Sequence, residues 1–224
     1  IYNVVGGFVA MFALISSSLT SACTRFLNFE MGKGTDSQLR TVFSTSLTVH
    51  IILACIIAVL CESFGVWYVN NKMVIPESRL IAANWVFQIS VLNFCVNLIT
   101  VPFNAAIIAH EKMSTFAYVS IFEGVSRLFI CFLVMWTSFD HLIAYALLYM
   151  LVQVSVMIMY QVYCYRNFNE CHYRFSIDKQ LTKHMFSYSG WHIFGNSASI
   201  LNRQGVDLVL NLFCGTILNA AKGI

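Results

Sequence analysis

Six apolar stretches constrain this chain most, because each exceeds the roughly 20 residues that a helix needs to cross the hydrocarbon of a bilayer. They cover residues 1–24, 42–64, 80–108, 115–136, 142–164 and 187–213. Runs such as residues 51–57 do not alternate between apolar and polar side chains, as transmembrane β-strands do. Only 10% of the 224 residues are charged, against about 25% in soluble domains. We therefore expect an all-α integral membrane protein, a polytopic bundle of about six transmembrane helices.

The basic residues between these spans indicate how the chain is oriented. Eight lie on one side of the predicted membrane: Arg25, Lys33, Arg40, Lys112, Arg166, Arg174, Lys179 and Lys183. Three lie on the other side: Lys72, Arg79 and Lys222. Cytoplasmic loops carry the excess of Lys and Arg in membrane proteins. The first group is therefore predicted to be cytoplasmic, and the first span to run from outside to inside.

The ends of the chain suggest a part of a longer polypeptide. Ile1 already stands inside an apolar stretch, and Ile224 follows no charged tail. The start has neither an initiator Met nor the basic and small-residue segments of a signal peptide. We expect an internal fragment.

Two pairs of charged residues stand inside the apolar spans. Glu123 and Arg127 are four residues apart, and so are Arg203 and Asp207. That spacing puts each pair on one helix face. A charge at the bilayer centre costs roughly 2.5–3.5 kcal/mol on insertion scales, so such residues usually face a bundle interior or a wet cavity. Each pair is either in contact with a solute or gate, or a structural ion pair that neutralises itself.

Amide side chains form a second polar pattern. Asn93, Asn97 and Asn104 share one face of the third span, and Pro102 favours a kink beside them. These amides either line a cavity or bond across helices, as buried amides do in many bundles. In the sixth span Asn196 lies on the face of the charged pair, where it meets water or another polar helix.

One arginine and one short segment are notable at the predicted cytoplasmic side. Arg25 closes a small-residue face of the first span at the cytoplasmic rim, where an anion can reach it. Residues 178–186 form a short amphipathic helix, which lies on the membrane surface or extends the next span into the cytoplasm.

Motifs of catalysis and nucleotide binding are absent from the sequence. It holds no HExxH, GxSxG or P-loop and no full dinucleotide fingerprint. We expect no enzyme activity, metal site or cofactor. The net charge of +3 is too small to indicate a nucleic-acid partner.

Four strings carry a family resemblance along essentially the whole chain. They are residues 1–9 (IYNVVGGFV) with the helix ending in 24–27 (TRFL), 40–46 (RTVFSTS), 101–113 (VPFNAAIIAHEKM) and 219–224 (NAAKGI). In this order they resemble polysaccharide biosynthesis proteins of the O-antigen flippase type. Those proteins belong to the multidrug/oligosaccharidyl-lipid/polysaccharide (MOP) exporter superfamily.

The resemblance implies a MATE-like fold of two pseudo-symmetric helix bundles around a central cavity. Residues 1–186 would hold family spans two to six of the first bundle with their cytoplasmic loops. Residues 187–224 would hold the first span of the second bundle and the turn after it. The implied location is the bacterial cytoplasmic (inner) membrane, in multi-pass form.

The implied function is the flipping of a polyprenyl-diphosphate-linked oligosaccharide by alternating access, for surface polysaccharide, lipopolysaccharide or O-antigen biosynthesis. Implied partners are that lipid-linked oligosaccharide, membrane lipids and the polysaccharide polymerase and export machinery. Charged residues lining the cavity matter in this family. The substrate candidates of this chain are Arg25, Asn93, Asn97, Asn104, Arg127, Asn196 and Arg203, and the ion-coupling or gating candidates are Glu123 and Asp207.

Other functions stay open on the sequence. The first is a cation-coupled exporter of small molecules or drugs from the same superfamily. A membrane glycan polymerase is disfavoured by the short predicted outer loops, at residues 65–79 and 137–141. A scaffold subunit of a synthase complex is the third.

Overall fold

A computed structural model describes residues 13–33, 36–71, 80–136, 140–175 and 177–195 of the chain. These residues are almost entirely helical, with no strand among them. The labelled elements are α2 (Ala13–Lys33), α3 (Asp36–Leu60), the π-helical turn η1 (Cys61–Gly65), α4 (Val66–Asn71), α5 (Leu80–Ala109), α6 (Met113–Trp136), α7 (His141–Asn167) and the 3₁₀ turn η3 (Asn169–Cys171). Residues 179–195 form one further helix, called helix 179–195 below.

Four helical segments are long and apolar enough to span a membrane: Ser37–Gly65, Leu80–Ala109, Met113–Trp136 and His141–Asn167. They coincide with the four middle spans predicted from the sequence, so the all-α class is confirmed and these four spans have the length and apolar composition of membrane-crossing helices. The predicted first and last spans extend into residues outside the described part. The count of six and the MATE-like arrangement therefore stay predictions.

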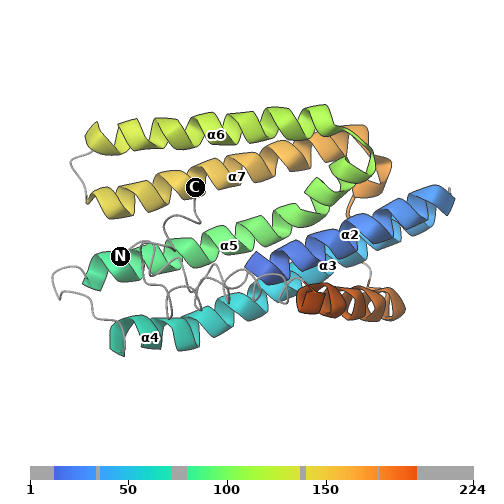
Figure 1. Ribbon diagram of the computed structural model, residues 1–224, viewed down its shortest axis with the longest axis horizontal. Helices are drawn as coiled ribbons and strands as arrows, with labels where there is room; N and C mark the ends of the chain where they lie inside the picture. The colour runs from blue at the N-terminus through green and yellow to red at the C-terminus, as the bar shows by residue number, and fades with distance from the viewer. Residues whose placement is uncertain (1–12, 34–35, 72–79, 137–139, 176, 196–224) are drawn as a thin grey trace, which may run out of the picture.

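The helix α5 lies at the centre of the described bundle. It contacts α2 and α3 on one side and α7 on the other, and α6 lies outermost against α7 (Figure 1). Antiparallel packing brings the ends of α2, α5 and α7 together with the starts of α3 and α6 (Figure 1). We call this the basic end, because Lys33, Arg40, Lys112 and Arg166 belong to these helix termini.

Two buried apolar clusters stabilise this arrangement. One, toward the basic end, centres on Phe43 of α3 and Phe103 of α5, whose rings meet edge to face with centroids 5.3 Å apart. The other holds Phe87 and Leu98 of α5 against α3. Gly65 allows the closest approach in the second cluster, because a Cβ at this position would overlap the Phe87 ring. The absence of a side chain there lets η1 pack directly on α5.

The C-terminus of α5 closes in a Schellman motif, the paired hydrogen bonds that commonly end a helix. The Lys112 amide donates to the Ile107 carbonyl and the Glu111 amide to the Ile108 carbonyl, both at 3.0 Å. Glu111 has φ of 56°, in the left-handed region where this motif normally places glycine. This tight turn sets α6 antiparallel to α5.

The segment that leads to helix 179–195 is bound along α3 by polar contacts. The Arg174 amide donates to Ser44 Oγ and the Asp178 amide to Thr45 Oγ1, both at 3.3 Å. Asp178 caps the helix by accepting from the amides of Gln180 and Leu181, at 2.8 and 3.1 Å. Since the helix then runs unbroken to residue 195, residues 178–186 extend the following predicted span. This supports the second of the two interpretations of that segment.

Candidate functional site

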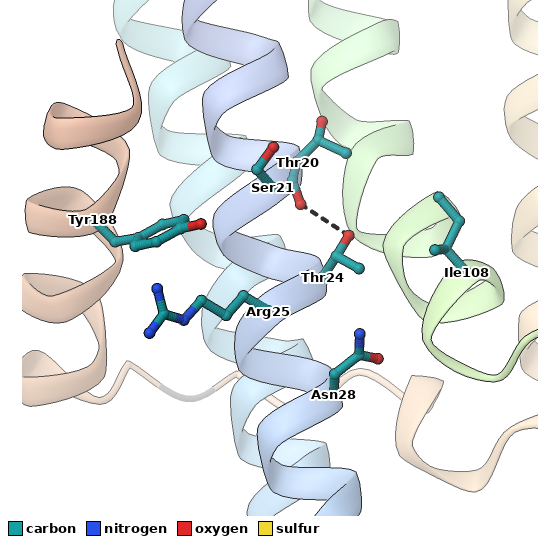
Figure 2. A pocket seen from close by; sticks show the side chains of 7 residues that line it. All are labelled: Thr20, Ser21, Thr24, Arg25, Asn28, Ile108 and Tyr188. Carbon is teal, nitrogen blue, oxygen red and sulfur yellow. Dashed lines mark hydrogen bonds between the residues drawn. The ribbon is translucent and has the colours of Figure 1, made fainter. Parts of the chain in front are cut away.

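An open pocket of about 550 Å³ lies between α2, the end of α5 and helix 179–195 (Figure 2). Arg25 extends toward helix 179–195 on one side of α2, and the α5 wall lies on the other side (Figure 2). The lining residues are Thr20, Ser21, Thr24, Arg25, Asn28, Ile108 and Tyr188.

The helical repeat explains how α2 supplies most of this lining. Thr20, Thr24 and Asn28 follow one another at intervals of four residues, as do Ser21 and Arg25, so they form adjacent rows on one surface. The apolar residues between them are buried in the bundle: Leu19, Ala22, Cys23 and Leu27. The pattern of α2 therefore presents a polar surface to the pocket and an apolar one to its neighbours.

Arg25 provides the positive charge of the pocket. Its guanidinium lies over the ring of Tyr188, 4.6 Å from the ring centroid. The side chain is exposed, and within the described residues it forms no ion pair. Its donor groups therefore remain available to an anion, and guanidinium binds phosphate or carboxylate groups in bidentate geometry.

Two hydroxyl groups of the pocket donate their protons within α2. Ser21 Oγ donates to the Ser17 carbonyl at 3.1 Å, and Thr24 Oγ1 donates to the Thr20 carbonyl at 3.0 Å. Because each hydroxyl proton is used within α2, the oxygens face the pocket as acceptors. The Asn28 amide adds both a donor and an acceptor. The pocket is thus suited to an anion that also carries hydroxyl groups.

The predicted amide file leads along α5 toward this pocket. Asn104 stands one helical turn before Ile108, which lines the pocket. The Oδ1 atoms of Asn93 and Asn104 are buried, and neither has a hydrogen-bond partner in the described structure. Asn97 is exposed. By this spacing the structure places Asn104 next to the pocket and the other two asparagines further along α5.

The Glu123–Arg127 pair forms as its spacing predicts, but in another place. Arg127 pairs with Glu123 on α6 and donates to Tyr149 Oη on α7 at 2.9 Å. Gln153 Nε2 of α7 donates to the same carboxylate at 2.8 Å. These four side chains join α6 to α7, and α7 and α5 separate them from α2 (Figure 1). The structure therefore does not bring Arg127 and Glu123 to the Arg25 pocket.

Three further candidates, Asn196, Arg203 and Asp207, lie outside the described residues.

Sequence reasoning missed several pocket residues. A sequence pattern could have predicted Thr20, Thr24 and Asn28, because their i, i+4, i+8 spacing indicates a polar helix face as clearly as the spacing of the asparagines in α5 does. No sequence pattern could have predicted Tyr188, because its contact with Arg25 joins segments far apart in the sequence.

The basic end also contains a contact that the sequence did not predict. The His110 ring stacks on Phe168, with centroids 3.9 Å apart, and His110 Nε2 pairs with Glu170 Oε1. Next to it, a hydrogen bond with Cys164 and burial raise the pKa of the Cys171 thiol, which keeps this thiol neutral. These contacts fix the α5–α6 turn against η3.

The described residues contain no group of three His, Cys, Asp or Glu side chains placed to hold a metal ion. No protein-family model, curated protein or solved structure matches this chain.

Proposed function

We propose that this chain belongs to a membrane transporter that flips a polyprenyl-diphosphate-linked oligosaccharide from the cytoplasmic to the outer leaflet by alternating access. One observation carries the proposal. Arg25, without a carboxylate partner in the described structure, stands in a polar pocket within a chain of which 58% is hydrophobic. An exposed guanidinium that has no carboxylate partner among the described residues can bind an anionic headgroup in this pocket.

The pocket chemistry fits the parts of that substrate. Arg25 binds the diphosphate through charge-assisted hydrogen bonds. The acceptor oxygens of Ser21 and Thr24 and the amide of Asn28 bind sugar hydroxyls. The prenyl chain stays in the surrounding lipid.

The position of the pocket fits the direction of transport. Ile108, in the last turn of α5, lines it, so the pocket lies near the basic end of the bundle. By the positive-inside rule this end faces the cytoplasm. Helix 179–195 supplies one wall, and its movement relative to α2 would change which side of the membrane the pocket faces.

The test is a flipping assay on the full-length protein in proteoliposomes that contain a fluorescent polyprenyl-diphosphate oligosaccharide. The fraction of label exposed on each leaflet is followed with a membrane-impermeant quencher. The protein is expected to flip the lipid, and Arg25→Ala is expected to slow flipping at least about tenfold, because one hydrogen-bonded charge contributes about 1.5–3 kcal/mol.

Lys33→Ala is the matched control. It also removes one positive charge from α2, but Lys33 pairs with Glu30 outside the pocket. Normal flipping by Arg25→Ala would remove the role given to this pocket. Export of small cationic dyes without any flipping would instead support the small-molecule exporter.

A further inference from the structure

A buried polar contact region lies next to the pocket, between α3 and helix 179–195. His50, near the middle of the Ser37–Gly65 span, is fully buried. Its Nδ1 lies 2.7 Å from the Ser46 carbonyl. Since a carbonyl can only accept, Nδ1 carries the proton and the ring of a neutral imidazole keeps its lone pair at Nε2. Nε2 is buried and has no hydrogen-bond partner in the described structure.

Ser189 provides a second buried atom of this kind. Its Oγ has no partner among the described residues either. The helix α3 and helix 179–195 run in the same direction (Figure 1), and Ser46 Oγ donates to Met185 Sδ between them at 3.6 Å. His50 and Ser189 each follow these residues by four positions, one turn further along the same faces. The two unpartnered atoms therefore belong to residues that both lie one helical turn beyond the Ser46–Met185 contact.

The same turn of helix 179–195 reaches the pocket. The Ser189 carbonyl accepts from Ser18 Oγ of α2 at 2.7 Å. The preceding residue, Tyr188, lies against the Arg25 guanidinium. A change where helix 179–195 packs on α3, at Ser46 and Met185, can therefore reach the wall of the pocket through the same helix.

We propose that His50 Nε2 is a proton-binding site, and that protonation there separates helix 179–195 from α3 and so moves Tyr188 away from Arg25. This inference deepens the proposed function and rests on it, because it names the cation that drives the transport cycle. No bond other than N–H changes: a proton from water adds to the Nε2 lone pair, and it returns to water when the ring becomes neutral again.

The physical reason is the cost of burying a charge. A neutral imidazole is tolerated in a dry interface, whereas an imidazolium without a counter-charge must regain hydration. Opening the contact with helix 179–195 admits water to Nε2, so protonation favours the separated state. The packed arrangement described above is the state of the neutral ring.

Among the described residues, no charged group lies within hydrogen-bonding distance of His50. In the described structure its one hydrogen bond is to Ser46, and it forms no ion pair. Titratable and charged groups on α3 and on the elements around it are Arg40 and Cys55 on α3, Cys23, Arg25, Glu30 and Lys33 on α2, Cys61 and Glu62 on η1, Cys95 on α5, Glu170 and Cys171 on η3, His172, Tyr173, Arg174 and Asp178 on the segment before helix 179–195, and Lys179, Lys183, His184, Tyr188 and His192 on that helix.

The first test measures the contact without substrate. Amide hydrogen exchange of helix 179–195 in the full-length protein is compared between pH 8 and pH 5, after correction for the intrinsic pH dependence of exchange. We expect at least about tenfold faster exchange at the lower pH, and the same rate at both pH values in His50→Gln. His184→Gln is the control, because it removes an exposed histidine from the same helix.

An unchanged exchange rate in the unmodified protein overturns the inference, whether or not His50→Gln folds. So does a pH response that persists in His50→Gln or disappears in His184→Gln.

The second test measures, in the flipping assay, whether a pH gradient changes the rate of lipid flipping. A pH gradient is expected to accelerate flipping at least about fivefold in the unmodified protein. In His50→Gln we expect labelled lipid to move between the two leaflets without a pH gradient, and we expect the gradient not to accelerate this movement. Acceleration that persists in this variant overturns the inference. If the unmodified protein flips no lipid, the proposed function fails, and the hydrogen-exchange test still decides whether His50 controls the helix.

Discussion

The guanidinium of Arg25 on α2 lies over the ring of Tyr188, with 4.6 Å between the guanidinium carbon and the ring centroid. This contact holds the one pocket residue of helix 179–195 against the cation of α2. Because a ring face attracts a cation without occupying its N–H donors, Arg25 is oriented and still able to bind an anion.

Tyr188→Ala should weaken binding of the diphosphate lipid about twofold to fivefold, since an exposed cation–π contact contributes about 0.5–1 kcal/mol. Tyr188→Phe keeps the ring and should bind like the unmodified protein. Binding is measured by titration of the fluorescent lipid in detergent. Equal losses in the two variants would assign the effect to the tyrosine hydroxyl and contradict the role of the ring face.

Glu123→Ala should destabilise the α6–α7 contact by about 1 kcal/mol, the upper range for interhelical hydrogen bonds in membranes. The substitution leaves Arg127 without its carboxylate and Gln153 without its acceptor. Reversible unfolding in detergent measures the loss.

The double variant Glu123→Leu with Arg127→Met removes both charges and should recover most of the stability. Its flipping rate should be normal, because the pair lies outside the Arg25 pocket. A double variant that is stable but inactive would show instead that the pair takes part in transport.

Gly65→Ala should destabilise the protein by about 1–3 kcal/mol, the usual cost of overpacking a core. The new Cβ overlaps the ring of Phe87, which is buried. Gly124→Ala is the matched control in α6, because a Cβ there meets no heavy atom within 4 Å. Combining Gly65→Ala with Phe87→Leu should recover part of the lost stability. A stable Gly65→Ala variant would mean that η1 is free to move away from α5.

Glu111→Gly should stabilise the protein by about 1 kcal/mol, because a residue with a Cβ is disfavoured in the left-handed region that Glu111 occupies at φ 56°. Lys112→Gly, one residue later, should bring no such gain. Thermal unfolding of the two variants in the same detergent makes the comparison. A loss of stability in Glu111→Gly would indicate that its side chain contributes more than its backbone costs.

The sequence was sufficient for the parts of the fold that depend on local hydrophobicity. Four spans were placed correctly because an apolar run of this length has few alternatives to a transmembrane helix. The bonding partners of the polar residues early in α3 were not predicted. Ser44 and Thr45 make this end of the helix look polar, but the segment before helix 179–195 covers and bonds them. Burial of this kind depends on tertiary contact and leaves no local pattern.

The residues of the candidate site were likewise predictable only where a local sequence pattern indicated them. Arg25 was found because it closes a small-residue helix face at the predicted cytoplasmic rim, and the pairing of Glu123 with Arg127 follows from their spacing. Tyr188 and His50 were not found. A single tyrosine or histidine in an apolar run has no periodicity, and its role depends on which helix packs against it.

The contact between α6 and α7 has a consequence for the synthesis of the protein. Gln153 follows Glu123 by 30 residues, so the charged side chains of α6 leave the ribosome well before their partners. Until α7 is made, Glu123 and Arg127 can pair only with each other, without the further hydrogen bonds that Tyr149 and Gln153 supply. We therefore expect the two helices to enter the bilayer from the translocon as one hairpin, with α6 held at the protein-conducting channel until α7 arrives.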